Sequence, residues 1–537
     1  MSFNDDEQIP GDLNASEVFI RILTSCVFIR IFIRIFTVGK AKLKIINSAV
    51  APVDESNLRV LLELTGLGND KERLGLDLVT VLDVSGSMKG DRLEKLKKAM
   101  EFIIKKLSPI DRLSIITFGT EAHKVCGLRV VNETSQVKII DLVMQIKAEG
   151  WTNITDGLQT ALKVLDGRKY KKGRSVGVML MSDGEQNRGG DATQVEVGNG
   201  SVYTFGFGTT TNARGDPKAM ADVLNGIARK SNGGTFSDVP KTDGLSAAFA
   251  QCLGGLLTFA VQDLKLVISP GNKTKVESVF AGDYGQSGNT NADPAVTISF
   301  GNLYDKEMRK IIVDLVLPKV DKEVTLQVLK IGYKYMNKDN TKVLKSPPIF
   351  ASVKHIGRST PVEREEVTVE ASRIQTAQMM KESRILADQE KFDAAKNKIV
   401  EAQNLLEDVE IDGTNSLIEL LKAELQQFLI FLQSPETYKK SGRAFALSAE
   451  LSHERFAARG DAEKSTGMFA TSRMEAYKKQ SESFEKGEPV PTAAEDAKEE
   501  VLADPIGPIS GALSLQIQIA IQALMSIQNI LDSAAPR

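Results

Sequence analysis

The chain has 537 residues, too many for a single hydrophobic core, and we expect about three domains. Hydrophobic residues make up 42% of it and charged residues 26%, as in ordinary soluble globular proteins. Its 68 basic and 70 acidic residues leave a formal charge of -2, which excludes a global basic field that would attract nucleic acid or anionic lipid.

The cysteines and the N-terminal residues indicate the cellular compartment in which we expect the protein. Cys26, Cys126 and Cys252 are odd in number and far apart, which fits neither a zinc ribbon, nor a RING finger, nor a disulfide framework. Such usage favours a reducing compartment. The start of the chain, MSFNDDEQ, is acidic where a secretory leader carries positive charge, so we expect no export and a cytoplasmic protein.

Residues 18–38 are almost wholly apolar except for Arg21, Arg30 and Arg34. An arginine near the bilayer centre costs about 2.5–3.5 kcal/mol, so we expect no stable membrane insertion. An interfacial amphipathic anchor is one alternative. The interpretation that we favour is a variable N-terminal extension, residues 1–39, outside the fold.

Two strands, KLKIIN and LRVLLEL, are predicted within residues 40–66, and residues 75–257 then alternate strands with helices. The predicted strands are LDLVTVL, RLSIITF, VCGLRVV, SVGVMLMS, VYTFGFG and GGTFSDV, and the predicted helices cover residues 91–107, 135–146, 155–165, 217–231 and 244–257. Continuously apolar strands separated by helices indicate a mainly parallel sheet covered on both faces. We therefore predict a doubly wound, Rossmann-like α/β domain.

Residues 258–356 contain alternating strands with Gly, Asn and Pro between them, which predicts an antiparallel β-sandwich. We expect the strands of residues 40–66 to complete this sandwich, so that the α/β domain is an insertion in it. We expect residues 362–537 to form a C-terminal α-helical region with helices at 365–409 and 414–433, the first containing one tetratricopeptide-like hairpin. Residues 456–504 are polar, contain prolines and are predicted to be partly loose.

Oxygen-bearing side chains follow the first strand of the α/β domain. Asp83, Ser85 and Ser87 come after LDLVTVL, and the glycine between the serines allows a turn that gathers them on one side. In open α/β sheets, ligands bind at the carboxyl ends of the strands. Thr152, in a loop that opens a helix, and Asp183, just past another core strand, occupy equivalent places. We expect these five side chains to share one crevice.

The ligand set that these residues offer contains oxygen but neither nitrogen nor sulfur, which suits a hard cation. Two carboxylates and three neutral hydroxyls leave a divalent ion with water ligands and an open coordination position. This coordination is typical of Mg²⁺, and Mn²⁺ is an alternative. A carboxylate from elsewhere is the natural sixth ligand. The predicted chemistry is therefore binding of an acidic group through a metal.

The motifs D-x-S-x-S, G-x-T and S-D-G resemble the metal-ion-dependent adhesion site (MIDAS) of von Willebrand factor type A (VWFA) domains. All five positions match: Asp83, Ser85, Ser87, Thr152 and Asp183. The resemblance implies that the hydroxyls contact the cation, and that the aspartates act directly or through water.

The order of domains and the stretches FGFG and GGTFSDV resemble plant proteins in which an inter-α-trypsin-inhibitor-like sandwich and helices follow the type A domain. Some of these relatives add a RING finger and act as ubiquitin ligases. The three cysteines of this sequence do not supply one, so ligase activity is not carried over.

A simpler interpretation of Asp83, Ser85 and Ser87 is a cluster that caps a turn, because Asp and Ser commonly close such loops. Thr152 and Asp183 at matching places favour the metal site instead. An aspartate-nucleophile phosphatase would need a second carboxylate where Ser85 stands. We therefore expect no enzyme, and a metal-dependent hydrolase is the less favoured alternative.

The sequence thus predicts a cytosolic, non-enzymatic interaction protein that binds a carboxylate of an unidentified protein partner through Mg²⁺. Trp151 is either a rim contact for that partner or a core residue. We also expect the last helix of the domain, residues 244–257, to shift as the site fills. The alternative function is that of a regulatory or decoy relative of RING ligases, acting or self-associating through its helical C-terminus.

Overall fold

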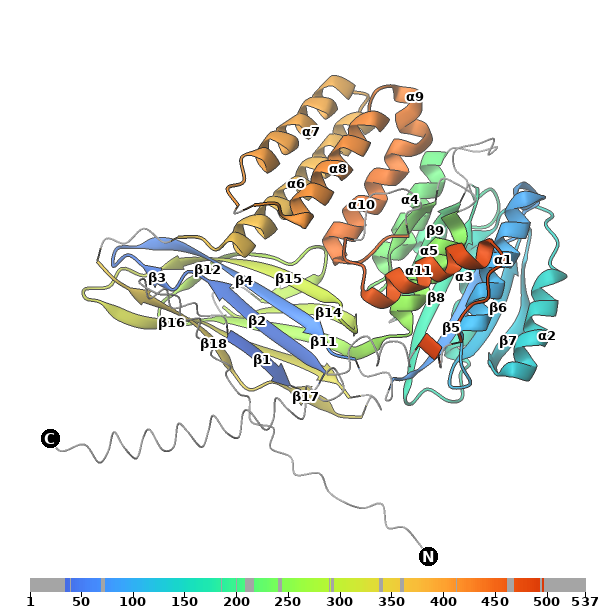
Figure 1. The fold of residues 1–537 in the computed structure, drawn as a ribbon, viewed down its shortest axis with the longest axis horizontal. Helices are drawn as coiled ribbons and strands as arrows, with labels where there is room; N and C mark the ends of the chain where they lie inside the picture. Colours follow the sequence, from blue (N-terminus) through green and yellow to red (C-terminus); the bar gives the residue numbers. More distant parts are fainter. Residues whose placement is uncertain are drawn as a thin grey trace, which may run out of the picture.

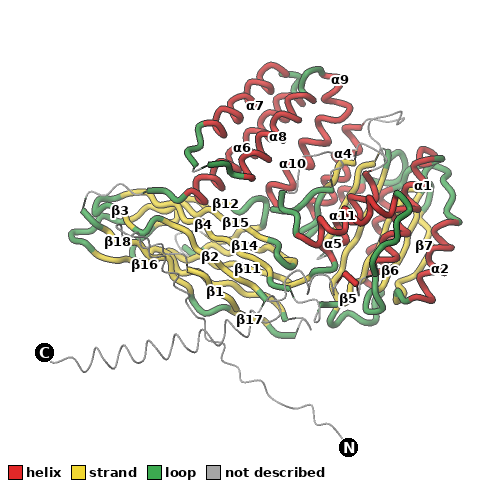
Figure 2. Tube along the Cα trace, in the orientation of Figure 1, coloured by secondary structure: helices red, strands yellow, loops and turns green. Residues whose placement is uncertain are grey.

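The computed structural model describes residues 34–38, 40–68, 73–184, 186–198, 200–207, 217–239, 244–288, 290, 294–337, 341–357, 362–411, 413–460, 468–492 and 495–496. The chain forms an α/β domain, a β-sandwich and a helical region that lies above both (Figure 1). Colouring by secondary structure separates the strand-rich sandwich from the helices (Figure 2). The predicted fold class is confirmed.

The α/β domain is built on a six-stranded sheet with the order β10-β9-β8-β5-β6-β7. Its strands are β5 (Gly75–Asp83), β6 (Arg112–Phe118), β7 (Ala122–Val130), β8 (Arg174–Ser182), β9 (Ser201–Phe207) and β10 (Phe236–Val239). All neighbours are parallel except β6 and β7, which pair antiparallel at one edge. Every residue of β5 is buried, as expected for a central strand covered on both faces.

Helices cover both faces of this sheet. They are α1 (Asp91–Lys106), α2 (Glu133–Met144) and α5 (Leu245–Leu256) on one face and α3 (Ile154–Asp166) and α4 (Pro217–Lys230) on the other. The two hydrophobic cores between helices and sheet are separated by the sheet itself. The ends of parallel strands therefore remain open for polar loops.

The sandwich consists of two sheets that enclose one hydrophobic core. One contains β1 (Arg34–Val38), β2 (Ala41–Asn47), β4 (Ser56–Gly66), β15 (Met308–Leu317) and β12 (Lys275–Phe280), in that order. The other contains β13 (Gly285–Gly288), β14 (Val296–Tyr304), β11 (Phe259–Pro270), β16 (Val324–Met336), β18 (Ile349–His355) and β3 (Val50–Ala51), with β17 (Val343–Lys345) paired to β16.

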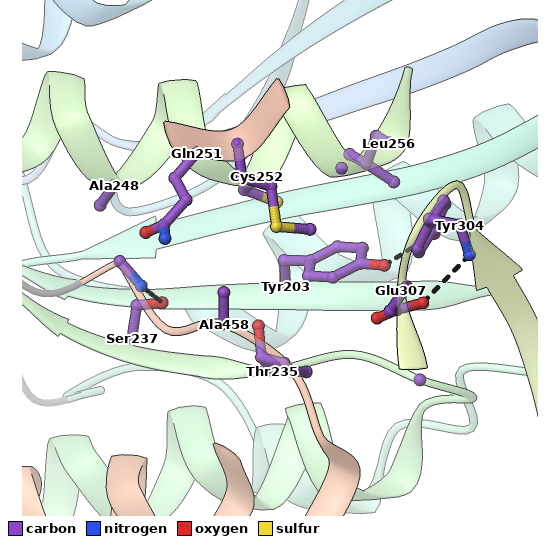
Figure 3. A pocket seen from close by; sticks show the side chains of 15 residues that line it. Tyr203, Thr235, Ser237, Ala248, Gln251, Cys252, Leu256, Tyr304, Glu307 and Ala458 are labelled. Atoms are coloured by element: carbon purple, nitrogen blue, oxygen red, sulfur yellow. Dashed lines mark hydrogen bonds between the residues drawn. The ribbon is translucent and has the colours of Figure 1, made fainter. Parts of the chain in front are cut away.

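The α/β domain lies between β4 and β11 in the sequence, and both of its connections meet at one turn of the sandwich. The backbone N–H of Gly68 donates to Oδ1 of Asp305 at 2.6 Å, and the N–H of Asp305 donates to the carbonyl of Thr258 at 2.6 Å. Next to this turn, the hydroxyls of Tyr203 and Tyr304 share a hydrogen bond of 2.8 Å between β9 and β14 (Figure 3).

The helical region begins with a hairpin of α6 (Glu365–Asp388) and α7 (Phe392–Glu407). The hairpin expected within residues 365–409 turns at Glu390, whose φ of 61° does not allow α6 to continue. The hairpin packs with α8 (Ser416–Phe431) and α10 (Arg443–Arg455) around a shared core, and the short α9 (Pro435–Thr437) lies between these two helices in sequence.

Two segments differ from the expectations for the sequence. Within residues 456–504, expected to be partly loose, the structure contains α11 (Ser472–Glu485) packed on α1 and α5. Residues 34–38, expected in an extension outside the fold, pair as β1 with the edge of β2. Their Ile, Phe, Thr and Val side chains favour strand, and the edge of β2 offers unpaired backbone groups.

Residues 1–33 and 497–537 lie outside the described residues. Among the helices that the structure describes, none combines the length and apolar character that crossing a bilayer requires.

Candidate metal centre

The candidate metal centre lies at the carboxyl ends of two adjacent parallel strands. Asp83 is the last residue of β5, and Asp183 directly follows β8, so the pairing of these strands brings both carboxylates to one edge. Both aspartates are fully buried. Ser85 is buried as well, whereas Ser87 is exposed and marks the side that is open to solvent.

Hydrogen bonds link four of the five predicted residues into a chain. The N–H of Ser85 donates to Oδ1 of Asp83 at 2.8 Å, and the hydroxyls of Ser85 and Ser87 lie 3.0 Å apart. Ser87 in turn donates to Oδ1 of Asp183 at 2.7 Å. The alternating side chains after β5 therefore gather on one side, toward the loop after β8.

Thr152 lies in the neighbouring loop, which the backbone holds against the other two. The N–H of Gly86 donates to the carbonyl of Gly150 at 3.1 Å, and the N–H of Thr152 donates to Oδ1 of Asn187 at 2.8 Å. Thr152 is buried, and α3 begins two residues later. Its hydroxyl makes no hydrogen bond to the other four predicted residues, all of which the structure describes.

Gly86 has a different role from the expected one. Its φ is not positive, so the turn does not depend on the conformational freedom of glycine. A Cβ at Gly86 would instead stand 3.4 Å from the carbonyl oxygen of Gly150. Gly150 itself has a φ of 83° and leaves no space for a side chain beside Thr120. Both glycines thus allow the two loops to lie close together.

The two buried carboxylates have different electrostatic partners. Burial raises the pKa of Asp83 to about 7, and the charge of Asp183 adds to this effect. Burial also raises the pKa of Asp183, against the hydrogen bond from Ser87 and the ion pair with Arg92 of α1. Among the described residues, no Lys, Arg or His forms an ion pair with Asp83.

This arrangement provides a place for a hard cation. A buried carboxylate without a cationic partner is costly, and a metal ion would relieve this cost for Asp83. In the part of the chain that the structure describes, no group of three or more His, Cys, Asp or Glu side chains could hold a metal. The remaining ligands at this centre would therefore come from hydroxyls, and the residues present fit Mg²⁺ or Mn²⁺.

Three residues that touch this centre were not predicted. Ser182 donates its hydroxyl to Oδ2 of Asp83 at 2.5 Å, Arg92 pairs with Asp183, and the side chain of Asn187 holds Thr152. Ser182 precedes Asp183 directly, so its place at a strand end was a usable signal. Nothing in the spacing of Arg92 or Asn187 indicates their contacts.

Two regions of the chain match known families. Residues 78–186 match the von Willebrand factor type A domain, and residues 414–483 match a family described as VWA / Hh protein intein-like. The first match begins in β5 and ends after Asp183, so it contains all five predicted metal ligands. The second covers α8 to α11 in large part. The predicted resemblance is confirmed.

Several curated proteins are similar to this chain. The E3 ubiquitin-protein ligase WAVH1 of Arabidopsis thaliana is 24% identical over 378 residues, covering 66% of this chain and 48% of WAVH1. An uncharacterized protein of Synechocystis is 34% identical over 195 residues, covering 34% of this chain and 42% of that protein. Human inter-alpha-trypsin inhibitor heavy chain H4 is 29% identical over 145 residues, covering 25% of this chain and 16% of that one. These matches span less than half the length of each relative.

A solved structure shares the fold more completely. The von Willebrand factor type A protein from Catenulispora acidiphila matches with a TM-score of 0.57 at 15% identity, covering 78% of this chain and 97% of that one. At this level of identity the likeness supports the fold alone. The shared region is larger than one α/β domain, so the domain combination is not unique to this chain.

Proposed function

From the von Willebrand factor type A domain that this chain carries, we propose a non-enzymatic interaction protein that binds Mg²⁺ and, through it, a carboxylate of a protein partner. One observation carries the proposal: Asp83 is a fully buried carboxylate beside Asp183, with hydroxyls around it and no ion pair among the described residues. Such a site is electrostatically incomplete, and a divalent cation would complete it.

The residues that would hold the ion are Asp83, Ser85, Ser87, Thr152 and Asp183. Mg²⁺ bound here would supply an electrophilic position that an incoming carboxylate can occupy. Hydrogen bonds from Ser182 and from the backbone of Ser85 fix the orientation of the Asp83 carboxylate before any ion arrives.

The exposure of Trp151 supports the proposal that the ligand is a protein. Its side chain is 58% exposed, so it is not the core residue that was the alternative. Its backbone N–H donates to the hydroxyl of Thr120 at 3.2 Å, which fixes the loop beside Thr152. An exposed tryptophan next to a metal site offers a large apolar contact to a partner, and such residues often dominate binding energy.

Catalysis at this centre is not part of the proposal. Ser85 stands where an aspartate-nucleophile phosphatase has its second carboxylate. The relatives named as ubiquitin ligases match this chain over less than half of their own length, and that activity is not proposed for it.

Direct metal binding tests the proposal. We expect Mn²⁺, followed by electron paramagnetic resonance, to bind the full chain at one site and to be displaced by Mg²⁺. Asp83→Ala should abolish this binding, whereas Asp141→Ala, which removes an exposed aspartate of α2, should not change it. A wild-type chain that binds no ion, or equal loss in both variants, would refute the metal centre.

Partner binding is tested separately by affinity capture from native extract with and without chelator. A partner that is lost both with chelator and with Asp83→Ala supports recognition through the metal. Retention of the partner under both conditions would point instead to the helical region, as expected for a regulatory relative of the ligases.

A further inference from the structure

A strongly basic cavity lies at the end of the α/β sheet away from the candidate metal centre. It has a volume of about 550 Å³, and the end of α3, β7 and the loop before β8 line it. Its charged lining residues are all basic: Arg112, Lys124, Lys163, Arg168 and Lys169. The volume lies within the range of pockets that hold small ligands, about 300–1,000 Å³.

The wall of this cavity, together with the neighbouring Arg174, contains more positive charge than the protein neutralises. Arg112, Arg168 and Arg174 all bond to the single carboxylate of Asp77, with four N–O distances between 2.5 and 3.0 Å. Three guanidinium groups against one carboxylate leave two positive charges unmatched, although their side chains are only 12%, 14% and 16% exposed. Partly buried excess charge of one sign is costly unless a counter-ion approaches.

The rim adds further positive charge, and its lining residues include no acidic side chain. Lys124, Lys163 and Lys169 are exposed, and none of them forms an ion pair with another described residue. Tyr170, 74% exposed, lies at the same rim, and its backbone carbonyl accepts a hydrogen bond from Arg112 at 2.8 Å. Asp166 contacts this loop through its backbone carbonyl, which accepts a hydrogen bond from Lys171.

The C-terminus of α3 would normally repel an anion, because unpaired carbonyl oxygens give it a partial negative charge. Here the side chain of Arg168 donates to the carbonyl of Leu165 at 2.9 Å. The N–H of Gly167 donates to the carbonyl of Lys163 at 3.1 Å. Capping this helix accounts for Arg168 alone. It does not account for Lys124 on β7 or for the three guanidinium groups around Asp77.

We propose that this cavity binds a small polyphosphorylated ligand, either a free inositol polyphosphate or the headgroup of a phosphoinositide. Guanidinium forks and flexible lysines are the side chains that bind phosphate groups most strongly. Asp77 and Asp83 are six residues apart on β5, or about 20 Å along the strand. The cavity is therefore a second site, independent of the metal centre.

Isothermal titration of the full chain with inositol hexakisphosphate, in metal-free buffer with chelator, tests this site. We expect saturable binding that weakens as salt rises, because the contacts are charge pairs at a rim. Lys124→Gln, Lys163→Gln and Lys169→Gln combined should weaken binding by about tenfold or more. Asp83→Ala should bind as the wild type does, which separates this result from failure of the metal centre.

The matched control removes the same charge elsewhere through Lys396→Gln, Lys422→Gln and Lys439→Gln, three lysines paired with exposed acids in the helical region. Equal weakening by the control triple, or no binding to the wild type, would overturn the proposal. Sedimentation with phosphatidylcholine vesicles, with and without phosphatidylinositol 4,5-bisphosphate, distinguishes the two sources. Vesicle binding that depends on this lipid and on the three rim lysines would identify the ligand as the phosphoinositide headgroup. Binding of the soluble compound alone would identify it as a free inositol polyphosphate.

Discussion

Arg92 and Asp183 form an ion pair at the edge of the candidate metal centre. Asp183 is fully buried, the side chain of Arg92 is 14% exposed, and both belong to segments that follow parallel strands of the sheet. Without a metal, the guanidinium neutralises one of the two carboxylates that would face the ion. Arg92 is therefore an internal competitor of any cation that binds there.

Arg92→Gln removes this positive charge and should tighten Mg²⁺ binding by about three- to tenfold, since two like charges close together repel. Calorimetric titration of Mg²⁺ into both proteins measures the change. The exposed Arg129 of β7 supplies the control, because Arg129→Gln removes the same charge away from the centre. Weaker binding in Arg92→Gln would mean that Arg92 mainly holds Asp183 in place.

Ser182→Ala removes the hydroxyl that donates to Asp83 at 2.5 Å and should weaken Mg²⁺ binding by about tenfold, as is typical when a partner of a metal ligand is lost. Ser175 is the matched control on the same strand, because its buried hydroxyl has no hydrogen-bond partner among the residues that the structure describes. We expect Ser175→Ala to bind Mg²⁺ with unchanged affinity. Equal effects of the two substitutions would contradict a positioning role for Ser182.

Asp111 should stabilise the α/β domain in a pH-dependent way. Burial alone would raise its pKa, but the hydrogen bonds from Arg73 and from the backbone of Leu76 and Ser108 hold the pKa below its ordinary value of 3.8. A carboxyl group with a lowered pKa contributes its stability above the ordinary pKa and loses it as the pH falls below that value.

Asp111→Asn should therefore lower the free energy of unfolding by about 2–4 kcal/mol at neutral pH, with a smaller difference near pH 3. Urea unfolding followed by the fluorescence of Trp151, the one tryptophan, reports on this domain. Asp141→Asn, an exposed change, should shift the free energy by less than about 0.5 kcal/mol. If the difference in the free energy of unfolding between wild type and Asp111→Asn instead grew as the pH fell, the pKa of Asp111 would not be lowered by folding, and the prediction would be wrong.

Arg455 joins all three parts of the molecule. Its guanidinium donates to the carbonyls of Ala228, Arg229, Ser231 and Gly234 in the α/β domain, and its Nε donates to Asp283 of the sandwich at 3.1 Å. Arg455→Met leaves these groups without a donor and should cost about 3–5 kcal/mol of stability. Arg364→Met, at a partly exposed arginine paired with Glu366, is the control for loss of a guanidinium. A cost below about 1 kcal/mol would mean that water replaces Arg455.

Much of the α/β domain could be predicted because its strands are apolar runs and its helices keep a regular spacing. The rule that ligands bind where parallel strands end also predicts Asp83 and Asp183 from the sequence alone. The contacts of Arg92 and Asn187 could not be predicted, because they depend on where long side chains point after folding. Whether Thr152 completes the metal centre stays a prediction.

The segment that contains α11 is more ordered than its composition suggests, for a physical reason. Its sequence, SRMEAYKKQSESFE, is mostly polar and has no strong helical stripe. A few large side chains nevertheless bury the helix against its neighbours, as Tyr477 does with its ring centroid 6.3 Å from that of Phe102 in α1. Tertiary contacts thus order a segment whose composition alone favours disorder.

The turn at Asp305 has a mechanical consequence. It fastens the incoming and the outgoing connection of the type A domain to the same point of the sandwich. A force that pulls the end of β4 away from the start of β11 is therefore borne first by the hydrogen bonds at Asp305. The type A domain lies between these two connections in the sequence, so this tension does not reach the domain until the hydrogen bonds at Asp305 break.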